Sequence, residues 1–304
     1  MIKKILKWAG IVVSSLVTLV VLFFVVAYFI SESRFNKHRD VAGHEIRIVN
    51  DSATIAKGEH VTRAVAKCQE CHGENLGGKI HFEQAGFGRI TTPNLTMGGV
   101  GAKLTGLDWE RAIRHGVSPE GKALRFMPSE GFVNLSDEEV TSIVAYIRSL
   151  PAVTVQPPET SYGWLIRGLF VAGIFPLLAV ETIKDHNAPH GATIPVSVTA
   201  AYGKHVSDVS GCVGCHGEHL SGGPIPGAPS NIPVPKNLTA DMETGLGKWT
   251  LADFKHALRE GKRPNGDTIN QFMPWKYVGQ LHDDELEALW LYLRSMPPMK
   301  LGNR

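Results

Sequence analysis

Cysteine is scarce in this chain, with four residues among 304. All four lie in two short motifs, CQECH at 68–72 and CVGCH at 212–216. No cysteine outside these motifs is left to form a structural disulfide, so disulfides cannot indicate the compartment in which the chain works. The two motifs therefore need a chemical explanation of their own.

The chain also lacks an excess of either charge, because 31 basic and 29 acidic residues give a formal net charge of +2. A nucleic-acid-binding domain typically presents a strongly basic surface. The balance of charge therefore argues against a nucleic-acid partner. Sustained alternation of apolar and polar residues is missing as well, so we expect no substantial β-sheet.

Three chemistries use two cysteines separated by two residues: a redox disulfide, half of a zinc site, and the thioether attachment of haem. A disulfide does not explain why His72 and His216 follow the two pairs. Two pairs could make one four-cysteine zinc site, but both histidines would then have no role. Attachment of haem uses both residue types, since the thiols bond the vinyl groups and the histidine binds iron. The motifs thus predict two covalently bound haem c groups, attached through Cys68, Cys71, Cys212 and Cys215.

The N-terminus combines lysines with a long apolar run. Lys3, Lys4 and Lys7 precede residues 8–30, which carry no charge. A helix of this length would be about 35 Å long, enough to cross a bilayer core. Lysines on the near side only predict a cytoplasmic N-terminus, with residues 31–304 on the outer face. A cleaved signal peptide is the alternative, but the run exceeds a typical signal-peptide core and no clear small-x-small cleavage site follows it.

We therefore expect a single anchor in the bacterial inner membrane. Residues 1–30 would be a cytoplasmic stub and the anchor, and residues 31–50 a linker. The enzymes that attach haem c work on the outer side of bacterial membranes. A periplasmic location for both haem motifs agrees with the orientation that the lysines predict.

The chain repeats itself after the anchor. Residues 51–152 align with residues 196–298 through short matches in the same order. The matched pairs are KGEHV and YGKHV, PNLT and KNLT, LDWERAIRHG and ADFKHALREG, FMP and FMP, and LSDEEVTSIVAYIRSLP and LHDDELEALWLYLRSMP. Repetition at a nearly constant offset indicates a duplicated domain of about 100 residues. We place the two domains at 51–152 and 196–304, with a linker at 153–195.

Each copy is expected to be mainly helical. The closing segment of each copy carries apolar residues at the spacing i, i+3, i+4 and i+7, which predicts one apolar helix face. These residues are Val140, Ile143, Val144 and Ile147 in the first copy, and Leu286, Leu289, Trp290 and Leu293 in the second. Ser136 with Glu139 predicts a capping box for the first of these helices, and His282 gives the second a weaker cap.

Two matched glycines have a structural interpretation. Gly58 and Gly203 lie on the helix that precedes each CxxCH motif. Because glycine has no side chain, it would let the closing helix of the same copy approach closely. Tyr146 and Tyr292 are the candidate neighbours on those closing helices.

A helix, CxxCH, glycine-rich loops, a Met-Pro pair and a closing helix make each copy resemble a class I c-type cytochrome. More narrowly, PNLT, the helix ending in RHG or REG, the Met-Pro pair and the closing YIRSLP are similar to the cytochrome c subunits of membrane-bound alcohol and gluconate dehydrogenases. The resemblance implies an all-α fold, with two tandem class I cytochrome c domains after a single N-terminal transmembrane helix. Those subunits usually have three haem domains and a C-terminal membrane segment. This chain departs from them with two domains and an N-terminal anchor, which leaves the partner enzyme open.

The resemblance also implies a methionine as the second axial ligand of each iron. Met127 and Met273 occupy matching positions, precede a proline and lie shortly before the closing helix, as the family pattern requires. Proline fixes its own φ and restricts the residue before it, so a Met-Pro loop can hold a thioether over a haem face. Met97 and Met242 also match, but we assign them to packing or loops. The predicted iron ligands are therefore His72, Met127, His216 and Met273.

Other matched polar residues leave alternatives open. His60 and His205 lie on the helix before each motif, and we interpret them as part of a solvated face, with histidine ligation of iron as the alternative. Asn94 and Asn237 either bond the haem propionates or close turns through side-chain-to-backbone hydrogen bonds.

The linker contains a second apolar segment at residues 162–183, whose uninterrupted apolar run is residues 168–180. The 13 residues of this run are short for a membrane span, and Pro176 lies within it. A second crossing would also return the second CxxCH motif to the cytoplasm, away from the enzymes that attach haem. We interpret the run as an interfacial or partner-binding segment, with a buried strap between the domains as the alternative.

A haem whose two axial positions are filled by the protein has no ready site for a substrate, so it passes single electrons. We expect a periplasmic relay, rather than an enzyme, between a quinol-oxidising complex or dehydrogenase and a terminal oxidase or soluble carrier. The alternative is the electron-accepting cytochrome subunit of a membrane-bound dehydrogenase of alcohol, aldehyde or sugar type. A dihaem peroxidase would need an iron with a displaceable ligand, and a Met-Pro pair in both copies argues against it. A haem-based sensor would need a signalling domain.

Overall fold

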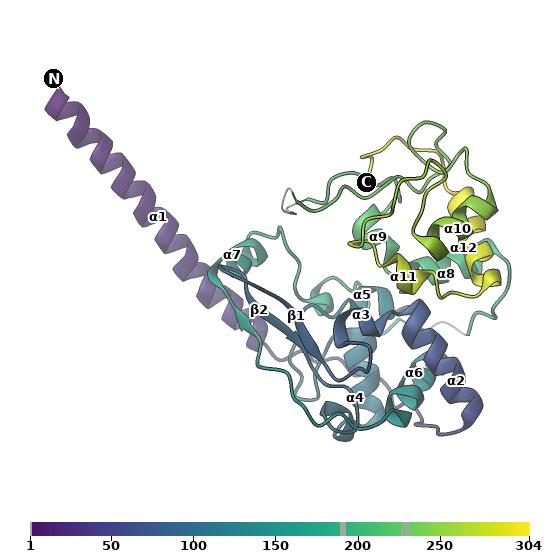
Figure 1. Ribbon diagram of the computed structural model, residues 1–304. Coiled ribbons are helices and arrows are strands. Elements are labelled where there is room, and N and C mark those ends of the chain that lie inside the picture. Colours follow the sequence, from purple (N-terminus) through teal and green to yellow (C-terminus); the bar gives the residue numbers. More distant parts are fainter. Residues whose placement is uncertain (1, 189–192, 227, 229–230) are drawn as a thin grey trace.

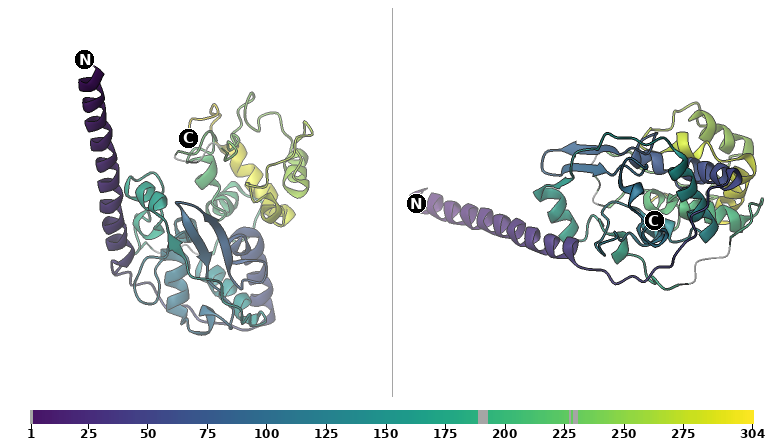
Figure 2. Two further views of the ribbon diagram at one scale, coloured as in Figure 1. Left: turned by 60° about the vertical axis from the view of Figure 1, so that its left-hand side comes forward. Right: turned by 90° about the horizontal axis from the view of Figure 1, so that it is seen from below.

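The computed structural model describes residues 2–188, 193–226, 228 and 231–304. A long N-terminal helix extends from a body in which two helical domains lie side by side (Figures 1 and 2). The first domain contains α2 (Ser52–His60), η1 (Val61–Val65), α3 (Cys68–His72), η2 (Val100–Ala102), α4 (Gly106–Glu110), η3 (Arg111–His115), α5 (Ser129–Phe132) and α6 (Asp137–Ser149). The second contains α8 (Ala200–Val209), α9 (Cys212–His216), α10 (Leu251–Glu260), α11 (Trp275–Val278) and α12 (Asp283–Ser295). The predicted arrangement of two mainly helical domains is confirmed.

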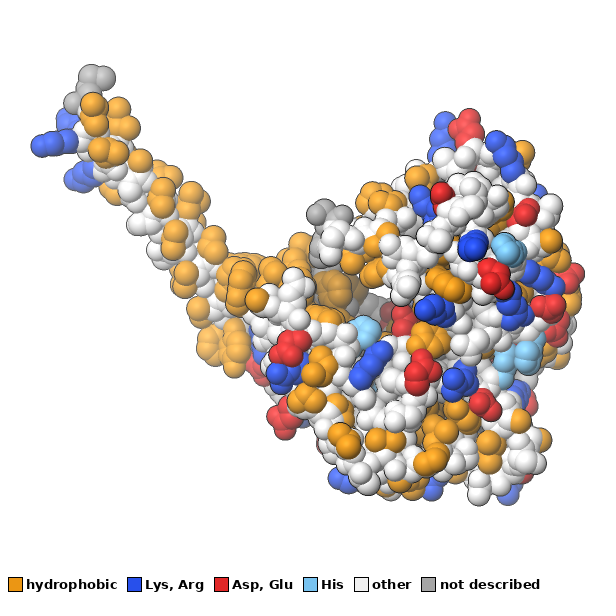
Figure 3. All heavy atoms as spheres, in the orientation of Figure 1, with side chains coloured by type: hydrophobic (Ala, Val, Ile, Leu, Met, Phe, Trp, Pro, Cys, Tyr) orange, Lys and Arg blue, Asp and Glu red, His pale blue; other side chains and the backbone are white. Residues whose placement is uncertain are grey.

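The N-terminal helix α1 spans Ile2–Asn36 and continues beyond the apolar run that the sequence shows. Within it, an 18-residue window has a mean hydropathy of 2.8 and no buried residue. In the described part of the chain, α1 is the one helix that is long and apolar enough to cross a membrane. Figure 3 shows apolar side chains along its length, with lysines near its free end. Its length and exposure are consistent with the predicted transmembrane anchor.

The first and last helices of each domain pack closely, as the matched glycines predict. A Cβ atom added to Gly58 would lie 1.8 Å from the carbonyl oxygen of Ser142 and 2.9 Å from Cβ of Tyr146. A Cβ added to Gly203 would lie 1.9 Å from the carbonyl oxygen of Ala288. The close approach of α6 to α2 and of α12 to α8 is therefore confirmed, although the nearest atoms to Gly203 belong to Ala288 and not to Tyr292.

The predicted capping box at the start of α6 is also confirmed. The Ser136 hydroxyl accepts a hydrogen bond from the Glu139 N–H at 3.2 Å, and the Glu139 carboxylate accepts one from the Ser136 N–H at 2.8 Å. The two bonds satisfy donors that a helix start leaves without intrahelical partners. At the start of α12, the His282 N–H donates to the Glu285 carboxylate at 2.7 Å.

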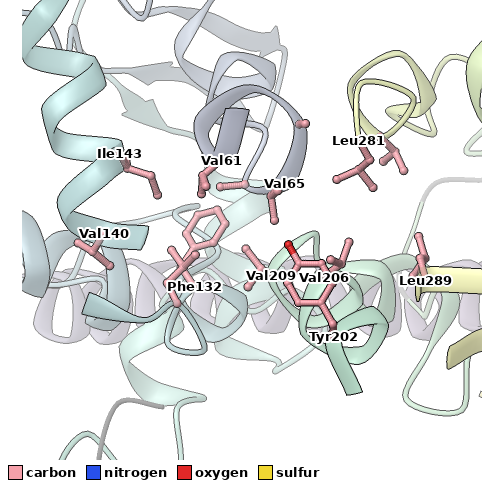
Figure 4. Close-up of a cluster of buried hydrophobic side chains, with 14 of the residues drawn as sticks. Val61, Val65, Phe132, Val140, Ile143, Tyr202, Val206, Val209, Leu281 and Leu289 are labelled. Atoms are coloured by element: carbon pink, nitrogen blue, oxygen red, sulfur yellow. The ribbon is translucent and has the colours of Figure 1, made fainter. Parts of the chain in front are cut away.

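The two domains share a hydrophobic core. Figure 4 shows Val65 and Phe132 of the first domain close to Val206 and Val209 of the second. All four side chains are buried and belong to one cluster that includes residues of both domains. The domains therefore bury apolar surface against each other as well as within themselves.

One sequence expectation about the fold was wrong, because the first domain contains a small antiparallel sheet. Its strands are β1 (Lys79–Gln84), β2 (Gly88–Thr92) and β3 (Ser161–Tyr162), in the order β1-β2-β3. The register shifts between Ile80 and Phe82, which breaks an already short alternation. So brief and irregular a pattern gives no sustained period of two. Through β3 the sheet holds the linker against the first domain.

The first part of the apolar segment in the linker forms α7 (Trp164–Val171), which packs against the end of the anchor (Figure 1). Arg167 donates to the hydroxyl of Ser31 and to the carboxylate of Glu32, both at 2.7 Å. The rings of Phe35 and Phe170 stack with centroids 5.3 Å apart. At eight residues, α7 is too short to span a bilayer, as predicted. The second part of the segment, around η4 (Ala179–Glu181), is buried as well, since Leu177, Leu178 and Val180 belong to a cluster that includes residues of the first domain. The segment therefore packs against both the anchor and the first domain, and its interfacial or partner-binding role stays a prediction.

Candidate haem sites

Both CxxCH motifs form a single helical turn, α3 (Cys68–His72) and α9 (Cys212–His216). In each, the two cysteines and the histidine stand at i, i+3 and i+4, which places them on one face of the helix. Each turn begins after a residue in the left-handed region, at φ 53° for Lys67 and 68° for Gly211. The two copies therefore present the same three side chains in the same local conformation.

The motif histidines are buried and fixed by one ring nitrogen. His72 Nδ1 lies 3.0 Å from the carbonyl oxygen of Pro93, and His216 Nδ1 lies 2.6 Å from that of Lys236. A proton on Nδ1 leaves Nε2 as the nitrogen available to a metal, the arrangement usual for metal-ligating histidines. Burial lowers the pKa of His72 to about 4 and also lowers the pKa of His216. Both rings are neutral at pH 7, which is the form that binds iron.

The cysteines are arranged for two separate sites and not for one zinc site. The part of the chain that the structure describes brings no three cysteines within the distances of a common metal ion. Burial raises the pKa of Cys68 to about 12 and that of Cys71 to about 11, and raises the pKa values of Cys212 and Cys215 as well. Zinc binds the thiolate, which these surroundings disfavour, whereas a thioether carries no charge. The donor set therefore fits haem.

The methionines differ in their surroundings. Met127 and Met273 are partly buried and pack against the core that Cys68 and Cys212 also contact. Each precedes a proline with nearly the same backbone, at φ −81° and ψ 54° in the first copy and φ −77° and ψ 47° in the second. Met242 is 58% exposed. These observations favour Met127 and Met273 as the iron ligands, and the assignment remains a proposal.

Asn94 and Asn237 are buried, and hydrogen bonds within the chain engage both ends of each amide. In both copies Oδ1 accepts a bond of 2.9 Å from the backbone N–H two residues further on. The amide Nδ2 donates at 2.6 Å to the carbonyl oxygen of Val153 in the first copy and of Met299 in the second. Of the two alternatives, the structure therefore shows the side-chain-to-backbone bonds, which hold the segment after the closing helix.

The interpretation of His60 and His205 as solvated was wrong. His60 Nε2 lies 2.6 Å from Oε2 of Glu285, and His205 Nε2 lies 2.8 Å from Oε1 of Glu139. Each histidine thus contacts the carboxylate of the other domain, in a reciprocal pair. Burial opposes ionisation of both carboxyls, but the histidine bonds and local hydrogen bonds hold their pKa values below the usual range. Sequence reasoning missed these pairs because they depend on how the two domains meet.

The same reciprocity brings the two CxxCH motifs to the domain interface. Helix α5 packs on α8, and α11 packs on η1, so each Met-Pro segment contacts the first helix of the other domain. Next to the first motif, Lys67 Nζ donates to the carbonyl oxygen of Ser210 at 2.5 Å. Ser210 in turn donates through its hydroxyl to the carbonyl oxygen of Val65 at 2.9 Å. The two haem attachment segments are therefore close neighbours.

Comparison with known proteins places both copies in cytochrome families. Residues 53–147 match the family described as cytochrome c oxidase, cbb3-type, subunit III, and residues 200–297 match the cytochrome c family. The cytochrome c subunit of a quinone-dependent alcohol dehydrogenase from Gluconacetobacter polyoxogenes is 26% identical over 274 residues, which cover 82% of this chain and 57% of the relative. The gluconate 2-dehydrogenase cytochrome c subunit of Pantoea cypripedii is 30% identical over 107 residues, or 34% of this chain and 24% of the relative.

A third relative is a dihaem c-type cytochrome from Cereibacter sphaeroides, 29% identical over 108 residues, which cover 33% of this chain and 36% of the relative. The chain spans less than two thirds of the length of each of these relatives. The two family matches coincide with the internal repeat, and each includes a CxxCH turn whose histidine is oriented for a metal. The chain is therefore a two-domain c-type cytochrome that carries two haem c groups.

Proposed function

We propose that this cytochrome is a membrane-anchored relay that passes single electrons between its two haems on the periplasmic face. The observation that carries the proposal is the reciprocal domain interface, in which the segments flanking both CxxCH motifs are in contact. The Lys67–Ser210 bond of 2.5 Å joins residues next to each motif. Because electron transfer falls steeply with distance, two haems attached at one interface are suited to exchange electrons.

The chain's own residues would hold each haem in the following way. His72 and His216 would bind iron through Nε2, with the ring held by the carbonyl bond at Nδ1. Met127 and Met273 would each supply the second protein ligand of one iron. The haem supplies the one-electron chemistry, and a methionine ligand raises its reduction potential relative to a second histidine. With a histidine and a methionine on each iron, neither site would leave a ligand position for a substrate, so the chain would carry electrons without catalysing a reaction of its own.

The membrane arrangement forms part of the proposal. The lysines before the apolar run favour a cytoplasmic N-terminus, which would place both domains in the periplasm. Helix α7 lies beside the outer part of α1, and Trp164 is 57% exposed there, as an aromatic side chain at a membrane interface would be. Protease accessibility of the haem domains in spheroplasts and in inverted vesicles tests the orientation.

We propose that the electron donor is a quinol-oxidising complex or a membrane-bound dehydrogenase, and that a terminal oxidase or a soluble carrier is the acceptor. The names of the relatives favour a second candidate, in which the chain is the electron-accepting subunit of a membrane-bound dehydrogenase of alcohol, aldehyde or sugar type. Both candidates use the same haem pair. They differ in whether the chain stays bound to one dehydrogenase.

Mass spectrometry of the proteins that stay bound to this chain distinguishes the two candidate functions. The native membrane is solubilised gently and the chain is isolated first. A quinol-oxidising complex or a haem–copper oxidase would make the chain a respiratory relay. A dehydrogenase with a flavin or quinone cofactor would make it that enzyme's electron outlet. A potentiometric titration of the isolated chain should show two one-electron haems. Catalytic turnover of hydrogen peroxide by the isolated chain would instead refute the relay and favour a peroxidase.

A further inference from the structure

We propose a site for a divalent transition-metal ion at the domain interface, formed by His60, His282 and Glu285. The ligand atoms of these three side chains lie within 4.8 Å of one another. His60 comes from α2 of the first domain, whereas His282 and Glu285 stand at the start of α12 in the second. None of the three residues belongs to a CxxCH motif or a Met-Pro pair, and the ion would join the two domains.

Glu285 is the fixed member of the cluster. Its side chain is 2% exposed, and its Oε1 accepts a hydrogen bond from the Tyr202 hydroxyl at 3.0 Å. Its Oε2 accepts one from the His282 N–H at 2.7 Å and faces His60 Nε2 at 2.6 Å. The carboxylate is thus held in contact with both domains. A metal ion at Oε2 would replace the proton shared with His60 Nε2, and these two atoms would move apart by less than about 1 Å to the spacing of metal ligands.

His282 is the adjustable member. Its side chain is 65% exposed, and Nδ1 lies 3.9 Å from the same Oε2 atom. Its ring stacks on that of His60, with centroids 3.8 Å apart and planes 12° from parallel. Ligand atoms of tetrahedral zinc lie roughly 3.3 Å apart, since each is about 2.0–2.2 Å from the metal. The stacked rings would have to tilt so that both lone pairs meet at one point, and the exposed His282 has room to turn.

Two imidazoles and one carboxylate form a donor set that suits Zn²⁺ or Cu²⁺ better than the hard cations Mg²⁺ and Ca²⁺. Three protein ligands leave a fourth position for water. Because the ligands come from α2 of the first domain and α12 of the second, the bound ion would link the two domains. It would favour the closed interface over any state in which the domains separate.

The internal repeat supplies a natural comparison. At the matching position His205 lies 2.8 Å from Glu139, as His60 lies beside Glu285. Ser136 occupies the place of His282 there, and its hydroxyl bonds the Glu139 carboxylate at 2.9 Å. The matching position therefore lacks a third metal ligand. Of the two equivalent His–Glu pairs, the geometry favours ion binding only at the one with His282.

The test uses the full-length cytochrome with both haems, purified in detergent with a tag that contains no histidine and freed of metal with a chelator. Titration with Zn²⁺ in a calorimeter should show one site per chain. His282→Ser, which copies the residue of the first domain, should weaken binding at least about tenfold. The haem spectrum should not change. His219→Ser, at an exposed histidine outside the cluster, is the matched control and should bind as the parent does.

Cu²⁺ offers a second measurement on the same proteins. Its electron paramagnetic resonance spectrum should show nitrogen coupling from two imidazoles in the parent and from one in His282→Ser. The reciprocal change Ser136→His should raise the number of bound ions from one to two. Unchanged affinity in a folded His282→Ser variant would overturn the proposal. A folded Ser136→His variant that still binds one ion would also contradict it, because this geometry would then not suffice.

Discussion

Replacing Gly58 with alanine tests the close packing of α2 on α6. The new Cβ would lie 1.8 Å from the Ser142 carbonyl oxygen and 2.5 Å from its carbon. These are backbone atoms that cannot rotate away, so the helices would have to separate by more than about 1 Å to reach ordinary contact, at a cost of up to about 3 kcal/mol. The higher helix propensity of alanine relative to glycine offsets about 1 kcal/mol of this destabilisation. The expected net loss is therefore about 2 kcal/mol.

Because the two domains share one hydrophobic core, they should unfold together, and for a unit of that size the loss corresponds to a fall of about 6 °C in melting temperature. Far-UV circular dichroism of the full chain in detergent measures it, and haem absorbance confirms that both haems remain attached. Gly203→Ala should behave alike, since its Cβ would lie 1.9 Å from the Ala288 carbonyl oxygen. Glu59→Ala, at an exposed position on the same helix as Gly58, is the control for propensity alone. A melting temperature for Gly58→Ala equal to that of the control would refute the reasoning.

Met127→Ala and Met273→Ala should each lower the reduction potential of one haem and alter its spectrum, while the haem stays covalently attached. Wild-type potentials in both variants would make the ligand assignment wrong, and Met97 and Met242 would be tested next. The lowered pKa of Glu285 means that its contribution to stability is complete at neutral pH and is lost as the pH falls through the acid range in which this carboxyl binds a proton. Glu285→Gln should therefore reduce the melting temperature at pH 7 and flatten its fall between pH 5 and 3, and an unchanged slope would contradict this. Arg167→Ala should weaken the packing of α7 on the anchor and raise the rate of proteolysis in the linker, without shifting either haem potential. Equal rates of proteolysis in parent and variant would show that the hydrogen bonds of Arg167 do not hold α7 in place.

The two CxxCH turns with their buried histidines could be predicted from sequence because the pattern is local. The residues of CxxCH need only one helical turn to share a face, and the histidine that follows decides among three chemistries. The close helix packing followed from a matched glycine on a helix whose partner carried an apolar stripe. Each of these inferences depends on residues within one copy of the repeat, where spacing alone fixes which side chains meet.

What the sequence could not give is how the two copies face each other. His60 and His205 look like surface residues of a helix until Glu285 and Glu139 of the other copy are placed beside them. One feature of the sequence could have indicated these pairs, because both the histidine and the glutamate occur at matching positions in the two copies. A basic and an acidic residue that are each repeated can form two equivalent ion pairs when the copies face each other. The small sheet was not predicted for a different reason. The alternation of apolar and polar residues in its strands is short, and a register shift after Ile80 interrupts it.

Duplication explains why this interface is built as it is. When two copies meet about an approximate two-fold axis, every contact made by the first helix of one copy is available to the other, as in an isologous interface. The Val65–Val209 region then buries apolar surface at the centre, with a His–Glu pair on each side. Domains in one chain move relative to each other by default unless their interface is large and apolar. A shared core favours a fixed separation of the two haems, so that electron transfer between them would not depend on domain motion.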